Sequence, residues 1–262
     1  MITGIIAAAT VVGIVGILIG FFLGISGEKF KVEVDPKEEA VLGVLPGNNC
    51  GGCGYPGCSG LAKAIANGEA PVNQCPVGGE PVAKKIGGIM GVDAGSGAKM
   101  VACVICGGDC EKGKTNYEYT GVEDCVAAAT APAGGPKACK YGCLGFGSCV
   151  KVCPFDAIHI VFGIAKVDKE KCKACSKCIA VCPRNMIELV PYDSKYAVSC
   201  RSTEKGKAVM DNCSVGCIGC GICAKNCPKG AIMVENNIAH IDYEKCEGCG
   251  ICAEKCPRKI IM

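Results

Sequence analysis

The chain begins with its longest uninterrupted apolar segment. Residues 2–25 carry no charged side chain, and as a helix they would extend about 36 Å, more than the roughly 30 Å apolar core of a bilayer. Lys29, Lys31 and Lys37 follow this segment and no basic residue precedes it, so the large C-terminal part is expected in the cytoplasm. The pattern predicts a single-pass anchor in the inner (plasma) membrane. A cleaved signal peptide is the alternative, but it needs a basic start and a small-residue cleavage site, which the sequence lacks.

After the anchor the apolar runs are short, and glycine interrupts them. An alanine-rich helix is predicted from Leu61, with Ser59 as its N-cap and Gly68 as its stop. Glycine-rich stretches at residues 87–97 and 127–135 are typical of linkers, and the stretch between them leans towards β-structure. Short elements of both kinds predict an α+β protein made of small domains.

Cysteines follow a pattern that occurs twice along the chain. Eight of them recur at a constant offset of 74 positions, and Pro154/Pro228 and Arg184/Arg258 match at the same offset. Because an internal repeat defines the unit of folding, one eight-thiol module is expected twice. The cysteine pairs are Cys139/Cys213, Cys143/Cys217, Cys149/Cys223, Cys153/Cys227, Cys172/Cys246, Cys175/Cys249, Cys178/Cys252 and Cys182/Cys256.

The second copy has the cysteine spacing of bacterial ferredoxins. Two Cys-x2-Cys-x2-Cys-x3-Cys-Pro runs follow one another, and in such runs three thiolates hold one 4Fe-4S cluster while the fourth ligates the other. Zinc is the alternative, because Cys-x2-Cys pairs also suit a tetrahedral ion, but the repeated fourth Cys-Pro favours iron–sulfur clusters. The two expected ligand sets are Cys217, Cys220, Cys223 with Cys256, and Cys246, Cys249, Cys252 with Cys227.

The first copy departs from this spacing, because Phe146 stands where the counterpart of Cys220 is needed. Cys139 lies upstream on a loop that could fold back, so it is expected to replace the missing thiol. A three-iron cluster, or none, is the alternative for this arc. Because Cys220 already fills this place in the second copy, Cys213 is expected to be a relic or a thiol beside that copy's cluster. The expected ligand sets are Cys139, Cys143, Cys149 with Cys182, and Cys172, Cys175, Cys178 with Cys153.

Two further sets of cysteines precede the repeats. One lies in a glycine-rich loop, where the backbone can approach an anionic cofactor; its spacing suits zinc or iron, and the neighbouring ferredoxin arcs favour a 4Fe-4S cluster. The other set could hold a sixth cluster or consist of buried structural thiols. Cys200 is expected to be a buried thiol rather than a ligand. The first set is Cys50, Cys53, Cys58 and Cys75, and the second is Cys103, Cys106, Cys110 and Cys125.

The composition agrees with domains that are built around cofactors. With 26 cysteines and no tryptophan in 262 residues, metal binding must supply much of the folding free energy. The formal charge of +3 counts every thiol as neutral, whereas six oxidised cubanes with their thiolates would bring the chain to about −9. The formal charge therefore does not indicate nucleic-acid binding. Disulfides are the other use of many cysteines, but they belong to oxidising compartments.

These observations predict five segments. They are the transmembrane anchor at 1–27, a 4Fe-4S domain at 28–90, a linker with an additional Cys-rich segment at 91–135, and two tandem bacterial-type ferredoxin-like modules, each with two 4Fe-4S clusters, at 136–196 and 197–262.

The N-terminal helix, the sequence LPGNNCGGCGYPGC from Leu45 to Cys58 and the ferredoxin repeats together resemble the B subunit of the Rnf complex, an ion-translocating ferredoxin:NAD+ oxidoreductase. The resemblance covers nearly the whole chain. It implies electron transfer from soluble ferredoxin to the other Rnf subunits, which carry flavins and a membrane-embedded iron–sulfur centre. No Walker loop or strand-linked GxGxxG occurs, so no substrate catalysis is expected from this chain alone. A polyferredoxin subunit of a membrane hydrogenase and a zinc-stabilised scaffold are the alternatives.

Basic residues around the second copy's arcs, among them Lys255, Arg258 and Lys259, are the expected docking surface for an acidic ferredoxin. The alternative is that they only keep an anionic protein solvated.

Overall fold

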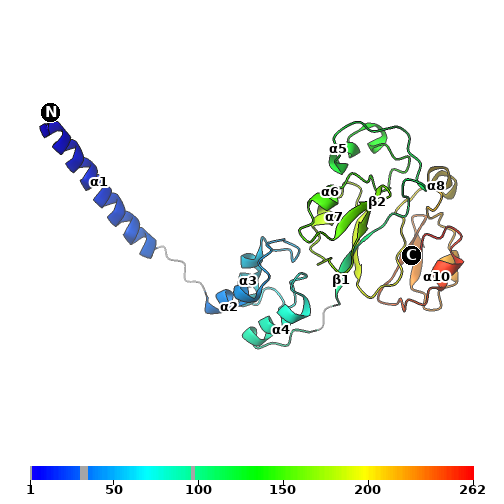
Figure 1. Ribbon diagram of the computed structural model, residues 1–262. Helices are drawn as coiled ribbons and strands as arrows, with labels where there is room; N and C mark the ends of the chain where they lie inside the picture. Colours follow the sequence, from blue (N-terminus) through cyan, green and yellow to red (C-terminus); the bar gives the residue numbers. More distant parts are fainter. Residues whose placement is uncertain (1, 30–34, 96–97) are drawn as a thin grey trace.

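Residues 2–29, 35–95 and 98–262 are described in a computed structural model (Figure 1). The first element, α1 (Ile2–Lys29), is a helix of 28 residues and stands apart from the cysteine-bearing domains in Figure 1. Among the residues so described, no helix combines the length and the apolarity that crossing a membrane requires. The expected transmembrane anchor therefore stays a prediction.

Three helices form the first cysteine-bearing domain, and their apolar sides meet in one core that includes Val41, Leu61, Ile65 and Ile86. The first of them begins at a proline, which suits the first helical turn, and Asp35 Oδ1 accepts a hydrogen bond from the Lys37 amide at 2.8 Å. These helices are α2 (Pro36–Val44), α3 (Cys58–Ala66) and α4 (Gly79–Met90).

The start of α3 differs from the prediction that Ser59 is its N-cap. The helix begins at Cys58, because Gly57 with φ of 100° turns the chain just before it. The cap comes from the preceding loop, where Asn49 Oδ1 accepts a hydrogen bond from the Cys58 amide at 2.8 Å. Gly68 follows the helix end with φ of 75°, as predicted for a stop.

The two ferredoxin-like modules are copies in structure as well as in sequence. Each consists of a short helix, a β-hairpin and a second short helix, and every element of the second set begins and ends 74 positions after its counterpart. The hairpins also share their antiparallel register, since Ile158 faces Val167 and Ile232 faces Ile241. The elements are α6 (Ser148–Lys151), β2 (Ile158–Val161), β3 (Ile164–Val167) and α7 (Lys177–Val181), then α9 (Ile222–Lys225), β5 (Ile232–Glu235), β6 (Ile238–Ile241) and α10 (Ile251–Lys255).

Each module is completed by a segment that precedes it in sequence. In the first, β1 (Met100–Val104) pairs antiparallel with β4 (Ile187–Pro191), so the stretch between the two predicted linkers contributes a strand, and Val101 joins the module's core. In the second, Val198 forms an antiparallel bridge with Ile261, the repeat counterpart of Ile187.

The remaining described elements surround the first module and the junction between modules. Ala128 of the short helix α5 packs against Leu144, and the Tyr119 and Phe146 rings lie beside them with centroids 5.0 Å apart. Phe146 therefore contributes packing at the position where the second module has Cys220. These elements are α5 (Cys125–Ala129), the 3-10 turn η1 (Pro132–Gly134) and α8 (Gly206–Asn212).

Candidate iron–sulfur sites

In the second module, the thiols gather in fours around two cavities. The empty volume is about 360 Å³ in one and about 380 Å³ in the other. Both sets are the ones predicted from ferredoxin spacing. They are Cys217, Cys220, Cys223 and Cys256, and Cys227, Cys246, Cys249 and Cys252.

In the first module, one cavity is lined by a predicted set and the other is not. Cys153, Cys172, Cys175 and Cys178 surround one cavity, as predicted. Around the other, the three thiols of Cys143, Cys149 and Cys182 are joined by Cys125. Cys139 lines a different cavity, so the fourth thiol beside this arc is Cys125 from the preceding segment and not the predicted Cys139.

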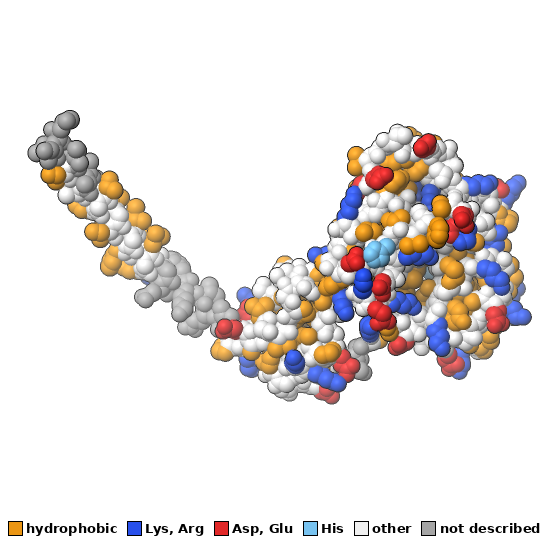
Figure 2. All heavy atoms as spheres, in the orientation of Figure 1, with side chains coloured by type: hydrophobic (Ala, Val, Ile, Leu, Met, Phe, Trp, Pro, Cys, Tyr) orange, Lys and Arg blue, Asp and Glu red, His pale blue; other side chains and the backbone are white. Residues whose placement is uncertain are grey.

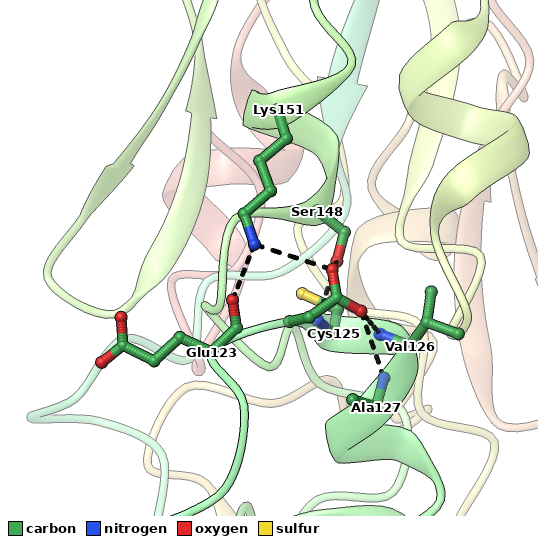
Figure 3. Close-up of polar contacts among 7 residues, drawn as sticks. Glu123, Cys125, Val126, Ala127, Ser148 and Lys151 are labelled. Atoms are coloured by element: carbon green, nitrogen blue, oxygen red, sulfur yellow. Dashed lines mark hydrogen bonds and ion pairs between the residues drawn. The ribbon is translucent and has the colours of Figure 1, made fainter.

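Hydrogen bonds to the first module fix the position of Cys125 (Figure 3). Its amide donates to Ser148 Oγ at 2.7 Å, and Ser148 Oγ donates to Asp124 Oδ2 at 2.7 Å. Because Ser148 precedes Cys149 in α6, the bonds attach α5 directly to the helix that carries the arc. The hydrogen bond from Ser148 is the main reason that the pKa of Asp124 lies below its usual range.

The same network caps α5. Asp124 Oδ1 accepts hydrogen bonds from the amides of Val126 at 2.8 Å and Ala127 at 3.1 Å, and Lys151 Nζ donates to the Glu123 carbonyl at 2.9 Å (Figure 3). An Asp before an alanine-rich run is an N-cap signal. That signal in the sequence predicts a helix beginning at Cys125, although it does not say which cavity the thiol reaches.

The set Cys103, Cys106, Cys110 and Cys125 is not brought together. Cys125 lines the cavity of the first module, Cys106 lines a different cavity, and Cys110 is exposed. Cys103 lies on β1, which pairs with β4. The chain after β1 then runs to the junction of the modules.

A further cavity lies at that junction, with an empty volume of about 520 Å³. Four cysteines line it: Cys106, Cys139, Cys200 and Cys213. Two of them, Cys139 and Cys213, are repeat counterparts. Cys200 is half-buried, and burial raises the pKa of its thiol to about 11.

The thiols of the N-terminal domain lie on the loop before α3, at the start of α3 and before α4. Burial raises the pKa of Cys75, and the thiolates of Cys58 and Cys53 act in the same direction. The Gly78 amide donates to Cys75 Sγ at 3.3 Å.

This domain faces the first module. A Cβ atom at Gly52 would lie 2.8 Å from the Cys175 carbonyl oxygen, so a glycine is needed for the close approach of the two backbones. After burial, the thiolate of Cys50 is among the groups that raise the pKa of Cys175. The two sets of thiols are thus neighbours.

The donor chemistry fits iron–sulfur clusters. Backbone amides point at sulfur in matched places, since Ala157 donates to Cys153 Sγ at 3.4 Å and its counterpart Ala231 donates to Cys227 Sγ at 3.3 Å. Burial raises the pKa of Cys149 to about 12, so a cationic iron core is what would stabilise its thiolate. In the part of the chain that the structure describes, no three Cys, His or carboxylate side chains converge as ligands of one metal ion would. The thiols stand around cavities that have room for a cluster of several atoms.

Family models match most of the cysteine-bearing chain. An Fe-S cluster family matches residues 45–77, an LdpA Fe-S cluster-binding domain matches residues 136–193, and a 4Fe-4S dicluster domain matches residues 171–231 and 216–260. Iron–sulfur domains therefore make up the helical N-terminal domain and the two modules, which contain both helices and strands.

Three curated relatives align over most of their length. The chain is 47% identical over 247 residues to the B subunit of the Na(+)-translocating ferredoxin:NAD(+) oxidoreductase complex of Acetobacterium woodii, covering 94% of this chain and 74% of the relative. It is 45% identical over 232 residues to the B subunit of an ion-translocating oxidoreductase complex of Methanosarcina acetivorans, covering 88% of each chain.

It is also 45% identical over 244 residues to the B subunit of the proton-translocating ferredoxin:NAD(+) oxidoreductase complex of Clostridium ljungdahlii, covering 92% of this chain and 86% of the relative. These alignments agree with the resemblance seen in the sequence motifs. The chain belongs to the family of B subunits of ion-translocating oxidoreductase complexes.

Proposed function

We propose that this chain is the multi-cluster electron-transfer subunit of a membrane-bound, ion-translocating ferredoxin:NAD+ oxidoreductase. It accepts electrons from reduced ferredoxin and relays them to the membrane and flavin subunits of the complex. The names of two relatives support this assignment. The observation that carries it is the presence of four cavities, each lined by four thiols, two in the first module and two in the second.

Five 4Fe-4S clusters are assigned to the four-cysteine sets of the N-terminal domain and of the two modules. When bound, each cluster supplies reversible one-electron transfer at low potential. The ligand sets are Cys50, Cys53, Cys58 and Cys75; Cys153, Cys172, Cys175 and Cys178; Cys125, Cys143, Cys149 and Cys182; Cys217, Cys220, Cys223 and Cys256; and Cys227, Cys246, Cys249 and Cys252.

Contacts between ligand-bearing segments support transfer along this series. The Cys50 loop approaches Cys175, as the contact of Gly52 indicates. Within the first module, α6 packs against α7, and within the second, α9 packs against α10. In each module, the two helices carry ligands of different clusters. The two cluster sites of a module are therefore adjacent.

Ferredoxin is proposed to dock on the second module, through a smaller set of basic residues than the sequence suggested. Arg258 is only partly exposed, and it donates to the carbonyls of Cys213 at 2.8 Å and Gly216 at 3.1 Å. Its role is structural. Lys225 and Lys255 are exposed at the ends of α9 and α10, and Figure 2 shows basic side chains over the surface of this part of the molecule.

Helix α1 is proposed to place the chain at the membrane, as a single-pass anchor with the remainder in the cytoplasm. Its large apolar side chains, such as Ile17, Phe21 and Phe22, are about 70% exposed and would gain an apolar environment there. The hydroxyl of Thr10 bonds to the Ile6 carbonyl at 3.0 Å, so its polar group is satisfied within the helix.

Anaerobic reduction of the full chain tests the function. We expect reduced ferredoxin to bleach the visible absorption of the purified holoprotein, at a rate that falls as ionic strength rises. Lys225→Glu/Lys255→Glu should slow this reduction and flatten its salt dependence, with iron content unchanged. A zinc-loaded, colourless protein, or one that ferredoxin does not reduce, would overturn the proposal.

A further inference from the structure

The cavity at the junction of the modules contains four cysteines that the five clusters leave unused. Its lining comes from both modules and from the segment before the first one. A search for ferredoxin spacing does not find these cysteines, because no two of them belong to the same arc. They are Cys106, Cys139, Cys200 and Cys213.

Two of these cysteines are repeat counterparts that are held in the same way. Arg184 Nη1 donates to the carbonyls of Cys139 and Gly142, both at 2.8 Å. Arg258 donates to the carbonyls of Cys213 and Gly216, which stand at the equivalent positions of the second copy. Each module thus uses the arginine after its last Cys-Pro to fix one cysteine at the junction.

The other two cysteines are structural counterparts, although no sequence offset of the repeat relates them. The Ile105 amide donates to the Met186 carbonyl at 2.7 Å, and the Ser199 amide donates to the Ile260 carbonyl at 2.9 Å. Met186 and Ile260 are repeat counterparts. Cys106 follows Ile105, and Cys200 follows Ser199. These two cysteines therefore stand at equivalent places at the edges of the two modules.

The backbone neighbours of the Cys106 and Cys200 sulfur atoms are also equivalent in the two modules. Cys106 Sγ accepts from the amide of Cys143 at 3.4 Å. The backbone of Cys217 lies beside the Cys200 sulfur. Because Cys143 and Cys217 are repeat counterparts, the junction cavity is lined by two pairs of cysteines related by approximate symmetry.

The four thiols surround one space. Cys106, Cys139, Cys200 and Cys213 all line the same cavity. A Cβ atom at Gly108 would lie 3.2 Å from Cys213 Sγ and 3.9 Å from Cys106 Sγ, so these two sulfur atoms border the same point.

A buried cation lies beside this space. Lys137 is only 8% exposed, it lines the junction cavity, and its Nζ donates to the Gly108 carbonyl at 2.8 Å. A buried charge is costly unless an opposite charge compensates it. A 4Fe-4S core with four thiolates carries about −2 when oxidised, and would compensate Lys137.

We propose that Cys106, Cys139, Cys200 and Cys213 ligate a sixth 4Fe-4S cluster at the junction of the two modules. The cavity has the room, since its empty volume of about 520 Å³ exceeds the 320 to 380 Å³ of the four cavities within the modules. The ligands come from four separate segments, so the cluster forms only when both modules have docked on each other.

The position of this cluster gives it a role, which rests on the proposed function. One of its ligands, Cys106, accepts a hydrogen bond from Cys143 of the first module, and another, Cys200, lies beside the backbone of Cys217 of the second. The junction cluster therefore connects the two modules. Each step moves one electron, so that one cluster is oxidised as its neighbour is reduced, and no bond or proton is transferred.

Iron and acid-labile sulfide in the full chain, purified anaerobically, test the site. We expect about 24 iron atoms per wild-type chain and about 20 in Cys106→Ala/Cys200→Ala, with the EPR signal of one cluster lost. The matched control, Cys103→Ala/Cys110→Ala, removes two cysteines that lie outside the cavity and should retain about 24. A wild-type value of about 20, or equal iron in wild type and Cys106→Ala/Cys200→Ala, would overturn the proposal.

A second variant covers the case in which the double substitution disturbs folding. Cys200→Ser keeps an oxygen ligand, and we expect it to retain iron while changing the EPR signal or midpoint potential of one cluster only; unchanged spectra would contradict the site. Ferredoxin reduction is a separate readout. A wild-type chain with about 24 iron atoms that ferredoxin does not reduce would contradict the proposed function and leave the junction site in place. A wild-type chain with about 20 iron atoms that ferredoxin does reduce would contradict the junction site and leave the proposed function in place.

Discussion

The two ferredoxin-like modules share their elements, their register and their arginine contacts, yet they complete their leading arcs differently. The second module has Cys220 within the arc. The first has Phe146 there, which packs against Tyr119, and the fourth thiol at its cavity is that of Cys125. The comparison teaches that a four-thiol site depends on where its sulfur atoms lie in the folded chain. A cysteine outside the repeat can take up such a position when tertiary contacts hold it there.

This difference has a consequence for stability. The clusters proposed for the second module would depend on thiols of one continuous segment. The leading cluster proposed for the first module would also depend on the network of Asp124 and Ser148 that holds α5. The first arc is therefore the one that distant substitutions can weaken.

The largest expected effect comes from removing Cys125 and Cys139 together. If these cysteines serve separate clusters, Cys125→Ala and Cys139→Ala should each remove about four iron atoms and the double variant about eight. If both thiols instead ligate one cluster, the double variant should lose only about four. Iron quantification with EPR distinguishes the two results. Cys220→Ala with Cys213→Ala is the matched pair in the second module.

The arginine contacts should give the next largest effect. Arg184→Ala leaves the carbonyls of Cys139, Gly142 and Gly134 without their donor, and we expect it to lower the free energy of unfolding of the holoprotein by about 2–4 kcal/mol. Arg258→Ala removes two such bonds and should cost less. Urea unfolding under anaerobic conditions measures both. Arg184→Lys keeps the positive charge but lacks the several N–H donors of the guanidinium group. Full stability in that variant would therefore contradict the role of these hydrogen bonds.

A smaller effect is expected from Ser148→Ala. Removing the hydroxyl leaves the buried amide of Cys125 without a partner, which costs about 1–3 kcal/mol. The leading cluster of the first module should then be lost sooner than the others when a chelator is added, as followed by EPR. Ile222→Ala, at the equivalent position of the second module, is the control. Equal loss rates for both modules would show that the network does not hold Cys125.

The smallest effect concerns pH. The folded-state pKa of Asp124 is depressed, mainly by the hydrogen bond from Ser148, so its contribution is present above the usual pKa of an aspartate and disappears as pH falls through the depressed value. Retention of the first module's leading cluster should therefore decrease in that acidic range. Asp124→Asn should remove this part of the pH dependence, and a wild-type pH profile in the variant would contradict the assignment.

The second module's ligand sets could be predicted because each lies in local arcs whose spacing determines the geometry. The position of Cys125 could not, since it depends on a contact between Asp124 and Ser148 that no spacing rule contains. The junction site escaped for a related reason. Cys139 and Cys213 are visible as repeat counterparts, but the equivalence of Cys106 and Cys200 depends on edge-segment pairing, which appears only in the folded chain.

The central claim is that electrons pass between the modules through the junction cluster. Rapid freeze-quench EPR of the full chain, mixed anaerobically with reduced ferredoxin, tests it most directly when wild type is compared with Cys106→Ala/Cys200→Ala. In wild type we predict that the clusters of both modules become reduced in succession. In the variant the second module should be reduced at the wild-type rate while the first module lags. Equal reduction rates of the first module in both proteins would contradict the claim.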